Sequence, residues 1–230
     1  MAVRAGAQGL GPEGGTMSRE PRFFEEVLTP AQADVLAALG PELDRAGYVL
    51  AGGTATALLL GHRRSADLDW LGPGPLDEPL RLAGTLGSVA PPWVTDRVAP
   101  GTLHGRARGI RVSVIEYRYP MLAPPVLWSS KGCRLASLDD LCAMKLAAVA
   151  QRGSRKDFWD VYALALLHRP LREMLELYRD KFGIHDPAHV LYGLAYLDDA
   201  DREPDPEILW DTTWKEVRQA VRRWVREIAG

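Results

Sequence analysis

The sequence predicts an α+β protein in which helices flank a mixed sheet and a helical region follows. Short apolar segments at 48–51 and 67–71 have the length and composition of strands, with a short helix-forming segment between them. The segment 93–117 has the alternation and the central turn of a β-hairpin. From residue 137 onward the apolar residues instead recur at helical spacing. Strands in the first half and helices in the second are typical of an α+β fold.

We expect three parts along the chain: a disordered leader at 1–20, an α/β core at 21–130 and a helical domain at 131–230. The leader is rich in Gly and Ala and lacks the apolar centre of a signal peptide. No apolar run approaches the ~18 residues that a membrane span needs. Cys133 and Cys142 are too few for a disulfide framework, so we expect reduced thiols in a cytoplasmic protein.

The charge balance argues against a tight, nonspecific nucleic-acid binder. The net charge is −2 and the pI is near 6.2, so no overall positive field attracts nucleic acid. A transient RNA-modifying enzyme stays possible, because a local basic patch is enough for that role.

The elements before residue 130 are predicted from local signals. Thr29-Pro30 is a helix cap followed by proline at the first helical position, and the helix is expected to continue to Ala46. A short helix is expected over 80–86. The segment 93–99 is expected to be a strand, and the next hairpin is expected to turn at Arg108-Gly109.

The stretch from Tyr48 to Leu71 is the centre of the functional prediction. Its first strand ends at Gly52 and Gly53, where free N–H groups and the dipole of the next helix favour a phosphate. Its second strand carries Asp67 and Asp69, whose side chains project from the same face because strands alternate. Two adjacent carboxylates are unfavourable without a cation, and hard oxygen ligands suit Mg²⁺.

The segment GGTATALLLGHRRSADLDW resembles the AbiEii/AbiGii-type nucleotidyltransferase toxins, which have a polymerase-β-like fold. The resemblance implies a site that binds a nucleoside triphosphate with Mg²⁺ or Mn²⁺. In this interpretation Asp67 and Asp69 are catalytic metal ligands. The residues expected to bind the nucleotide are Gly52, Gly53, Thr54, Arg64, Ser65 and Lys156.

A second motif follows Ser137, which with Asp140 has the spacing of a capping box. Lys145 lies in the apolar part of this predicted helix, so either its stem reaches the surface or its amine meets an anion. The segment from Met144 to Tyr162 resembles the second motif of the same family. That resemblance implies that Lys145 contacts the phosphates and that Asp157 completes the site. Asp160 is expected to face the same way, or to bond Arg152 or Lys156.

Glu116 is the candidate for a third metal ligand. It closes the apolar face formed by Ile110, Val112 and Val114 on the second hairpin strand. Polymerase-β-like enzymes often carry a third carboxylate on such a strand, beside the first two. The alternative, a glutamate that faces solvent or is paired at a strand end, has equal weight.

The sequence therefore predicts a metal-dependent nucleotidyltransferase. A carboxylate, either Asp157 or a metal ligand, would take the proton of the acceptor hydroxyl. The resemblance implies a toxin that acts on tRNA and is neutralised by a cognate antitoxin. The alternatives are transfer to a protein or a small molecule, and a catalytically silent nucleotide-binding protein.

Overall fold

A seven-stranded mixed sheet forms the first part of the protein. The computed structural model describes residues 21–230, so the leader expected at 1–20 lies outside the described residues. Within the described part the strand order is β3-β4-β5-β2-β1-β7-β6. Strand β1 pairs antiparallel with β2 and parallel with β7, while β2 pairs parallel with β5. The strands are β1 (Val49–Ala51), β2 (Leu68–Gly72), β3 (Trp93–Ala99), β4 (Thr102–Ala107), β5 (Ile110–Glu116), β6 (Val126–Trp128) and β7 (Cys133–Leu135).

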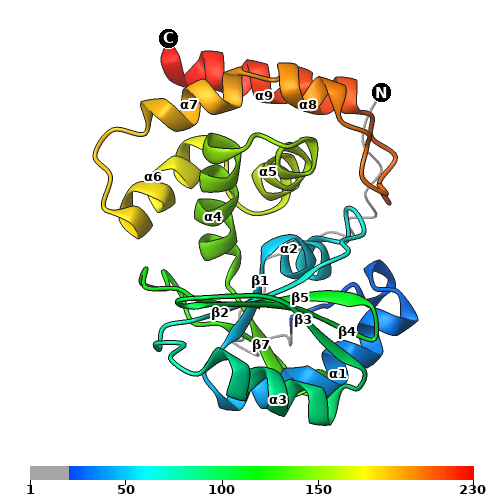
Figure 1. The fold of residues 1–230 in the computed structure, drawn as a ribbon. Coiled ribbons are helices and arrows are strands. Elements are labelled where there is room, and N and C mark those ends of the chain that lie inside the picture. The colour runs from blue at the N-terminus through cyan, green and yellow to red at the C-terminus, as the bar shows by residue number, and fades with distance from the viewer. Residues whose placement is uncertain (1–20) are drawn as a thin grey trace, which may run out of the picture.

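Helices cover both faces of the sheet (Figure 1). Helices α1 and α3 lie on one face, and α2 lies on the other, between the sheet and the C-terminal helices. The helices are α1 (Pro30–Arg45), α2 (Gly52–Leu60), α3 (Pro79–Val89), α4 (Leu138–Gln151), α5 (Arg155–Leu167), α6 (Leu171–Phe182), α7 (Ala188–Ala195), α8 (Asp198–Arg202) and α9 (Trp214–Ala229). Two short 3₁₀ helices, at Glu25–Val27 and Ser129–Lys131, complete the assigned helices of residues 21–230. The α+β prediction is confirmed.

Two hydrophobic cores correspond to the two parts of the fold. The first lies mainly between the sheet and α1 and α3, and it buries Leu39, Trp70 and Val112. The second lies among the C-terminal helices and buries Phe158 and Val217. Helix α2 contributes to both cores and joins them. The sheet extends to β7, so the boundary predicted at residue 130 falls inside the sheet.

Local signals explain the elements that were predicted well. Thr29 caps α1 through a full capping box with Gln32. The hairpin turns at Arg108 and Gly109, which both have positive φ, as a tight hairpin turn requires. Ser137 caps α4 by accepting a hydrogen bond from the Asp140 N–H at 3.0 Å.

No helix within residues 21–230 combines the length and the hydropathy needed to cross a bilayer. Cys133 and Cys142 are both free and buried. Burial raises the pKa of the Cys133 thiol to about 12, so this thiol stays protonated at neutral pH.

Candidate active site

The two aspartates of the D-x-D motif lie at the start of β2, in the middle of the sheet. Asp67 directly precedes the strand, and Asp69 is its second residue. Leu68 and Trp70, which alternate with them, are buried in the sheet core. The carboxylates therefore lie on the opposite face of the sheet, on the side of α2. The predicted juxtaposition of Asp67 and Asp69 agrees with this arrangement.

The glycine turn lies directly against these carboxylates. Gly52 has φ +65°, and a Cβ at this position would lie 2.5 Å from Asp69 Oδ2. A Cβ at Gly53 would lie 2.8 Å from Ser65 Oγ. No side chain of the described residues caps the N-terminus of α2, so its first N–H groups stay available. The turn thus brings free N–H donors, Asp69 and Ser65 to one place.

Positive charge compensates the D-x-D pair only in part. Burial raises the pKa of Asp69, and the charge of Asp67 adds to this, while a hydrogen bond from Ser113 opposes it. Arg111 Nε lies 2.7 Å from Asp67 Oδ1 as an ion pair. That oxygen is buried, and neither Arg111 nor another group in the described part of the chain reaches it with hydrogen-bond geometry. A divalent cation fits this donor set, because Mg²⁺ commonly binds one or two carboxylates together with substrate phosphates.

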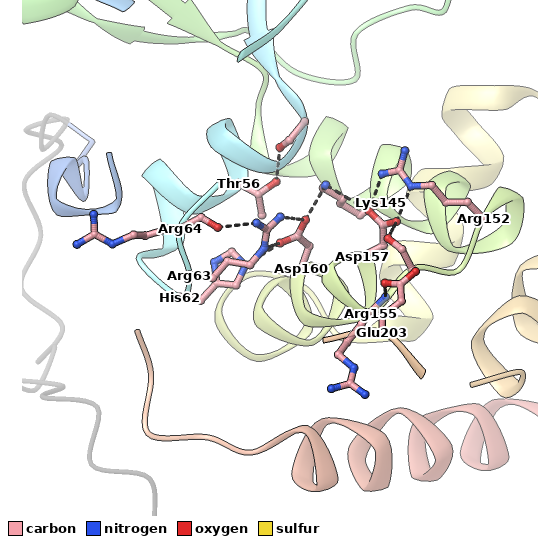
Figure 2. Close-up of polar contacts among 12 residues, drawn as sticks. Thr56, His62, Arg63, Arg64, Lys145, Arg152, Arg155, Asp157, Asp160 and Glu203 are labelled. Atoms are coloured by element: carbon pink, nitrogen blue, oxygen red, sulfur yellow. Dashed lines mark hydrogen bonds and ion pairs between the residues drawn. The ribbon is translucent and has the colours of Figure 1, made fainter. Parts of the chain in front are cut away.

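A buried ion cluster lies beside the pair and centres on Asp160, which has no exposed surface (Figure 2). Asp160 binds Lys145 Nζ at 2.6 Å and the Arg63 guanidinium at 2.7 and 2.8 Å. It also contacts His62 Nε2 at 2.7 Å. Burial by itself would raise the pKa of Asp160, but the charges of Arg63 and Lys145 outweigh it and hold the pKa well below its usual range. This aspartate is therefore a fixed anion.

Asp157 belongs to the same cluster and is also fully buried. Arg152 donates two hydrogen bonds to it, at 2.7 and 2.8 Å, and the Ser154 hydroxyl donates a third at 2.7 Å. Lys145 Nζ lies 3.6 Å from it. Burial opposes ionisation, but Arg152 and Lys145 overcome this and lower the pKa of Asp157. These contacts leave Asp157 a poor base, so we interpret it as a residue that positions Lys145.

Several residues predicted to bind the nucleotide lie around the glycine turn. The Thr54 hydroxyl donates to the Asp67 carbonyl, so this side chain fixes the carboxylate strand and leaves only its N–H for a phosphate. Lys156 is exposed and has no ion-pair partner within residues 21–230. The charges of Lys145 and Lys156 both lower the pKa of Asp69, against the effect of burial.

Arg64 does not point into this site, contrary to the prediction. Its guanidinium pairs with Glu207 at 2.8 Å and, in Figure 2, extends away from Asp160 and Lys145. The preceding residue, Arg63, turns inward instead. The side chains of these two adjacent residues point in opposite directions, and the order of the two arginines in the sequence does not indicate which one is buried. Asp160 likewise pairs with Arg63 and Lys145, whereas Arg152 pairs with Asp157.

Of the two alternatives for Glu116, the structure contradicts the metal ligand and agrees with the glutamate paired at a strand end. The residue of β5 that pairs with Asp69 is Ser113, whereas Glu116 pairs with Gly72 at the end of β2. Because side chains alternate, Glu116 lies on the face of Leu68, opposite that of Asp69. It pairs there with Arg118. No cluster of three or more His, Cys, Asp or Glu side chains suited to a metal occurs in the described residues.

Four residues of this region were absent from the sequence prediction: Arg63, His104, Arg111 and Ser113. The last three line an open groove of about 360 Å³ that begins at the D-x-D pair. The alternation of β5 placed Arg111 and Ser113 on a common face, opposite Glu116. The missing information was the register of β5 against β2, which brings that face to Asp69.

A family model described as the nucleotidyl transferase AbiEii toxin of a Type IV toxin–antitoxin system matches residues 109–227, more than half of the chain. This chain belongs to the AbiEii family. A protein of Aquifex aeolicus, aq_aa25, which carries no assigned function, is 35% identical over 185 residues, covering 78% of this chain and 87% of its own. The chain is therefore a nucleotidyltransferase of a toxin family. The family match includes the Lys145–Asp160 motif but begins after Asp67 and Asp69.

Two solved structures from Helicobacter pylori share the fold. A candidate nucleotidyltransferase superposes with a TM-score of 0.53 at 17% identity, covering 86% of this chain and 91% of that one. The protein JHP933 gives a TM-score of 0.52 at 17% identity, covering 86% and 88%. Identity at this level shows a common fold alone. Both matches cover 86% of this chain, so they include the sheet and the helical region.

Proposed function

We propose that this protein is a metal-dependent nucleotidyltransferase that transfers NMP from an NTP to an acceptor hydroxyl. Asp67 and Asp69 would hold Mg²⁺ or Mn²⁺. When bound, the metal would neutralise charge on the reacting phosphates. The close approach of Gly52 to Asp69 carries this proposal, because it joins a phosphate-binding turn to a carboxylate pair in which the pKa of Asp69 is still raised.

The nucleotide phosphates would lie between the start of α2 and the lysines. The N–H groups of Gly52, Gly53 and Thr54 suit an anion, as uncapped helix starts generally do. Lys156 is exposed and unpaired in the described structure, so it can neutralise the leaving pyrophosphate. Lys145 is already held by Asp160, so its role is a fixed positive charge close to the phosphates.

For the acceptor we propose tRNA, with the enzyme acting as a toxin that a cognate antitoxin neutralises. Family membership supports the toxin role and an antitoxin partner. The groove beside Asp67 carries Arg97 and Arg111, and guanidinium groups there favour an acceptor that bears phosphate. The second candidate, transfer to a protein hydroxyl, is supported by the overall charge of −2.

The test incubates purified protein with each α-labelled NTP, Mg²⁺, total tRNA and a mixed protein extract. Asp67→Ala and an EDTA arm run in parallel. Label in tRNA with wild type alone supports the proposal. Label in protein would replace tRNA by a protein acceptor. Label in tRNA with Asp67→Ala at the wild-type rate would contradict the metal assignment.

A further inference from the structure

We propose that His104 takes the proton of the acceptor hydroxyl during transfer. The inference rests on the proposed function. In the step, the acceptor oxygen attacks the α-phosphorus of the NTP, a new O–P bond forms and the bond to the β-phosphate oxygen breaks. Pyrophosphate leaves with that electron pair, and the hydroxyl proton moves to Nε2 of His104.

The sheet register places His104 in line with the carboxylate pair. His104 on β4 pairs with Ser113 on β5, and Ser113 pairs with Asp69 on β2. Paired residues of neighbouring strands project from the same face, so the three side chains form one row across the sheet. His104 also lines the groove of about 360 Å³ that contains both aspartates. It is thus beside the metal-binding carboxylates, on the open side of the site.

The hydrogen bonds of this row define which ring nitrogen is free. His104 Nδ1 lies 3.1 Å from Ser113 Oγ. A serine hydroxyl can accept a hydrogen bond as well as donate one. In the tautomer in which the Nδ1–H group of His104 donates to Ser113 Oγ, Nε2 keeps its lone pair. Within residues 21–230 that nitrogen has no hydrogen-bond partner.

The other carboxylates near the site are engaged elsewhere. Arg152 and Ser154 hold Asp157, and the Arg63 guanidinium with Lys145 holds Asp160. Neither carboxylate is exposed. Both therefore lack an accessible lone pair for an incoming hydroxyl proton.

The remaining acids are also unsuitable. Glu116 lies on the opposite face and pairs with Arg118. Asp96 lines the groove, but Arg106 Nη2 binds it at 2.6 Å. With Asp67 and Asp69 assigned to the metal and the charge of Asp96 paired with Arg106, we assign the proton to His104, whose ring nitrogen Nε2 lies in the described groove without a partner. The other charged groups facing it are Arg97 on β3, Arg111 on β5, Asp69 on β2 and Asp67 directly before β2.

The test compares His104→Ala and His104→Asn with wild type under single turnover. Asparagine keeps an amide donor where Nδ1 was, so it can retain the Ser113 bond but has no base. We expect both variants to lose about 100-fold in the rate of nucleotide transfer. Free imidazole should restore His104→Ala. NTP affinity should stay within about twofold of wild type, because a proton acceptor that lies away from the phosphate turn affects the chemical step and not binding. His185→Ala, at an exposed histidine, is the matched control.

Pyrophosphate release is measured alongside transfer, because it reports the reaction with any acceptor. If His104→Asn transfers nucleotide at the wild-type rate, the inference is overturned and the role of His104 is limited to its hydrogen bond with Ser113. A His104→Ala rate equal to wild type would overturn it as well, while the proposed function stands. If wild type releases no pyrophosphate with any acceptor, the proposed function fails and the inference fails with it. Circular dichroism confirms that each variant is folded.

Discussion

At the scale of single residues, the protein compensates the two pairs of carboxylates in this region differently. Asp157 and Asp160 are surrounded by arginine and lysine groups that lower their pKa values. Asp67 forms an ion pair with the exposed Arg111, and the pKa of Asp69 is raised by burial even though the charges of Lys145 and Lys156 lower it. The fold supplies a full set of counter-ions to the first pair and leaves the second to a ligand. This contrast is the physical basis for assigning the metal to Asp67 and Asp69.

Asp69→Asn should stabilise the metal-free protein and abolish transfer. Burial and the charge of Asp67 raise the folded pKa of Asp69, so its ionisation lowers stability as pH rises above the unfolded pKa of about 4. An amide removes that cost, and the melting temperature in EDTA at pH 7 should rise by a few degrees. A lower melting temperature would show that Asp69 is already compensated without metal.

Asp160→Asn should destabilise the fold by about 3–5 kcal/mol, because it leaves Lys145 and Arg63 buried without their anion. Urea denaturation measures the loss. Asp205→Asn is the matched control, since Asp205 pairs with Arg155 but is about half exposed. Its effect should stay below about 1 kcal/mol. Equal effects at the two positions would mean that the buried cluster contributes no special stability.

At the scale of elements, the glycine turn between β1 and α2 links the fold to the chemistry. The φ of +65° at Gly52 directs the chain into α2 and leaves room for the Asp69 carboxylate. Only a residue without Cβ satisfies both conditions, since a left-handed conformation is costly for other residues. The turn therefore requires glycine for backbone conformation and for space.

Gly52→Ala should abolish transfer, because its Cβ would lie 2.5 Å from Asp69 Oδ2 and displace the carboxylate. Gly47→Ala is the control for backbone strain alone, since Gly47 has φ +85° and open space around it. It should cost about 1–2 kcal/mol in denaturant unfolding and leave the transfer rate intact. Full activity in Gly52→Ala would show that the Asp69 position tolerates displacement.

Elements with strong local signals could be predicted from the sequence, and those set by tertiary pairing could not. Helix α1 and the β4–β5 hairpin follow from Thr29-Pro30 and Arg108-Gly109. Strands β6 and β7 have three residues each and gain their structure from neighbouring strands, so no local pattern marks them. The D-x-D face followed from alternation alone. The failed placement of Glu116 and the omission of His104 both follow from strand register, which is a property of the assembled sheet.

At the scale of the whole molecule, the site lies where the two hydrophobic cores meet. Helix α2 belongs to both cores, and Arg63, in the loop after it, reaches Asp160 on α5 of the helical region. The Lys181–Asp140 ion pair, at 2.6 Å and without exposed surface, ties α6 to the start of α4. Substitutions that remove these contacts should therefore affect both the stability of the fold and the geometry of the site.

The protein should lose stability in acid partly through the Asp157 and Asp160 carboxylates. Their folded pKa values are lowered, so their contribution is complete above the unfolded pKa of about 4 and is lost as pH falls through the folded values. The free energy of unfolding in urea, measured from about pH 3 to about pH 7, should depend less on pH for Asp160→Asn than for wild type. Identical pH dependence would assign the acid sensitivity to other groups.

The central claim is that the D-x-D carboxylates bind the catalytic metal, and a comparison of two groove aspartates tests it most directly. Asp67 and Asp96 line the same groove, but Asp96 is neutralised by Arg106. Pyrophosphate release with NTP, Mg²⁺ and tRNA is measured for Asp67→Asn, Asp96→Asn and wild type. We predict loss of release for Asp67→Asn and a rate near wild type for Asp96→Asn. Wild-type release by Asp67→Asn would contradict the claim.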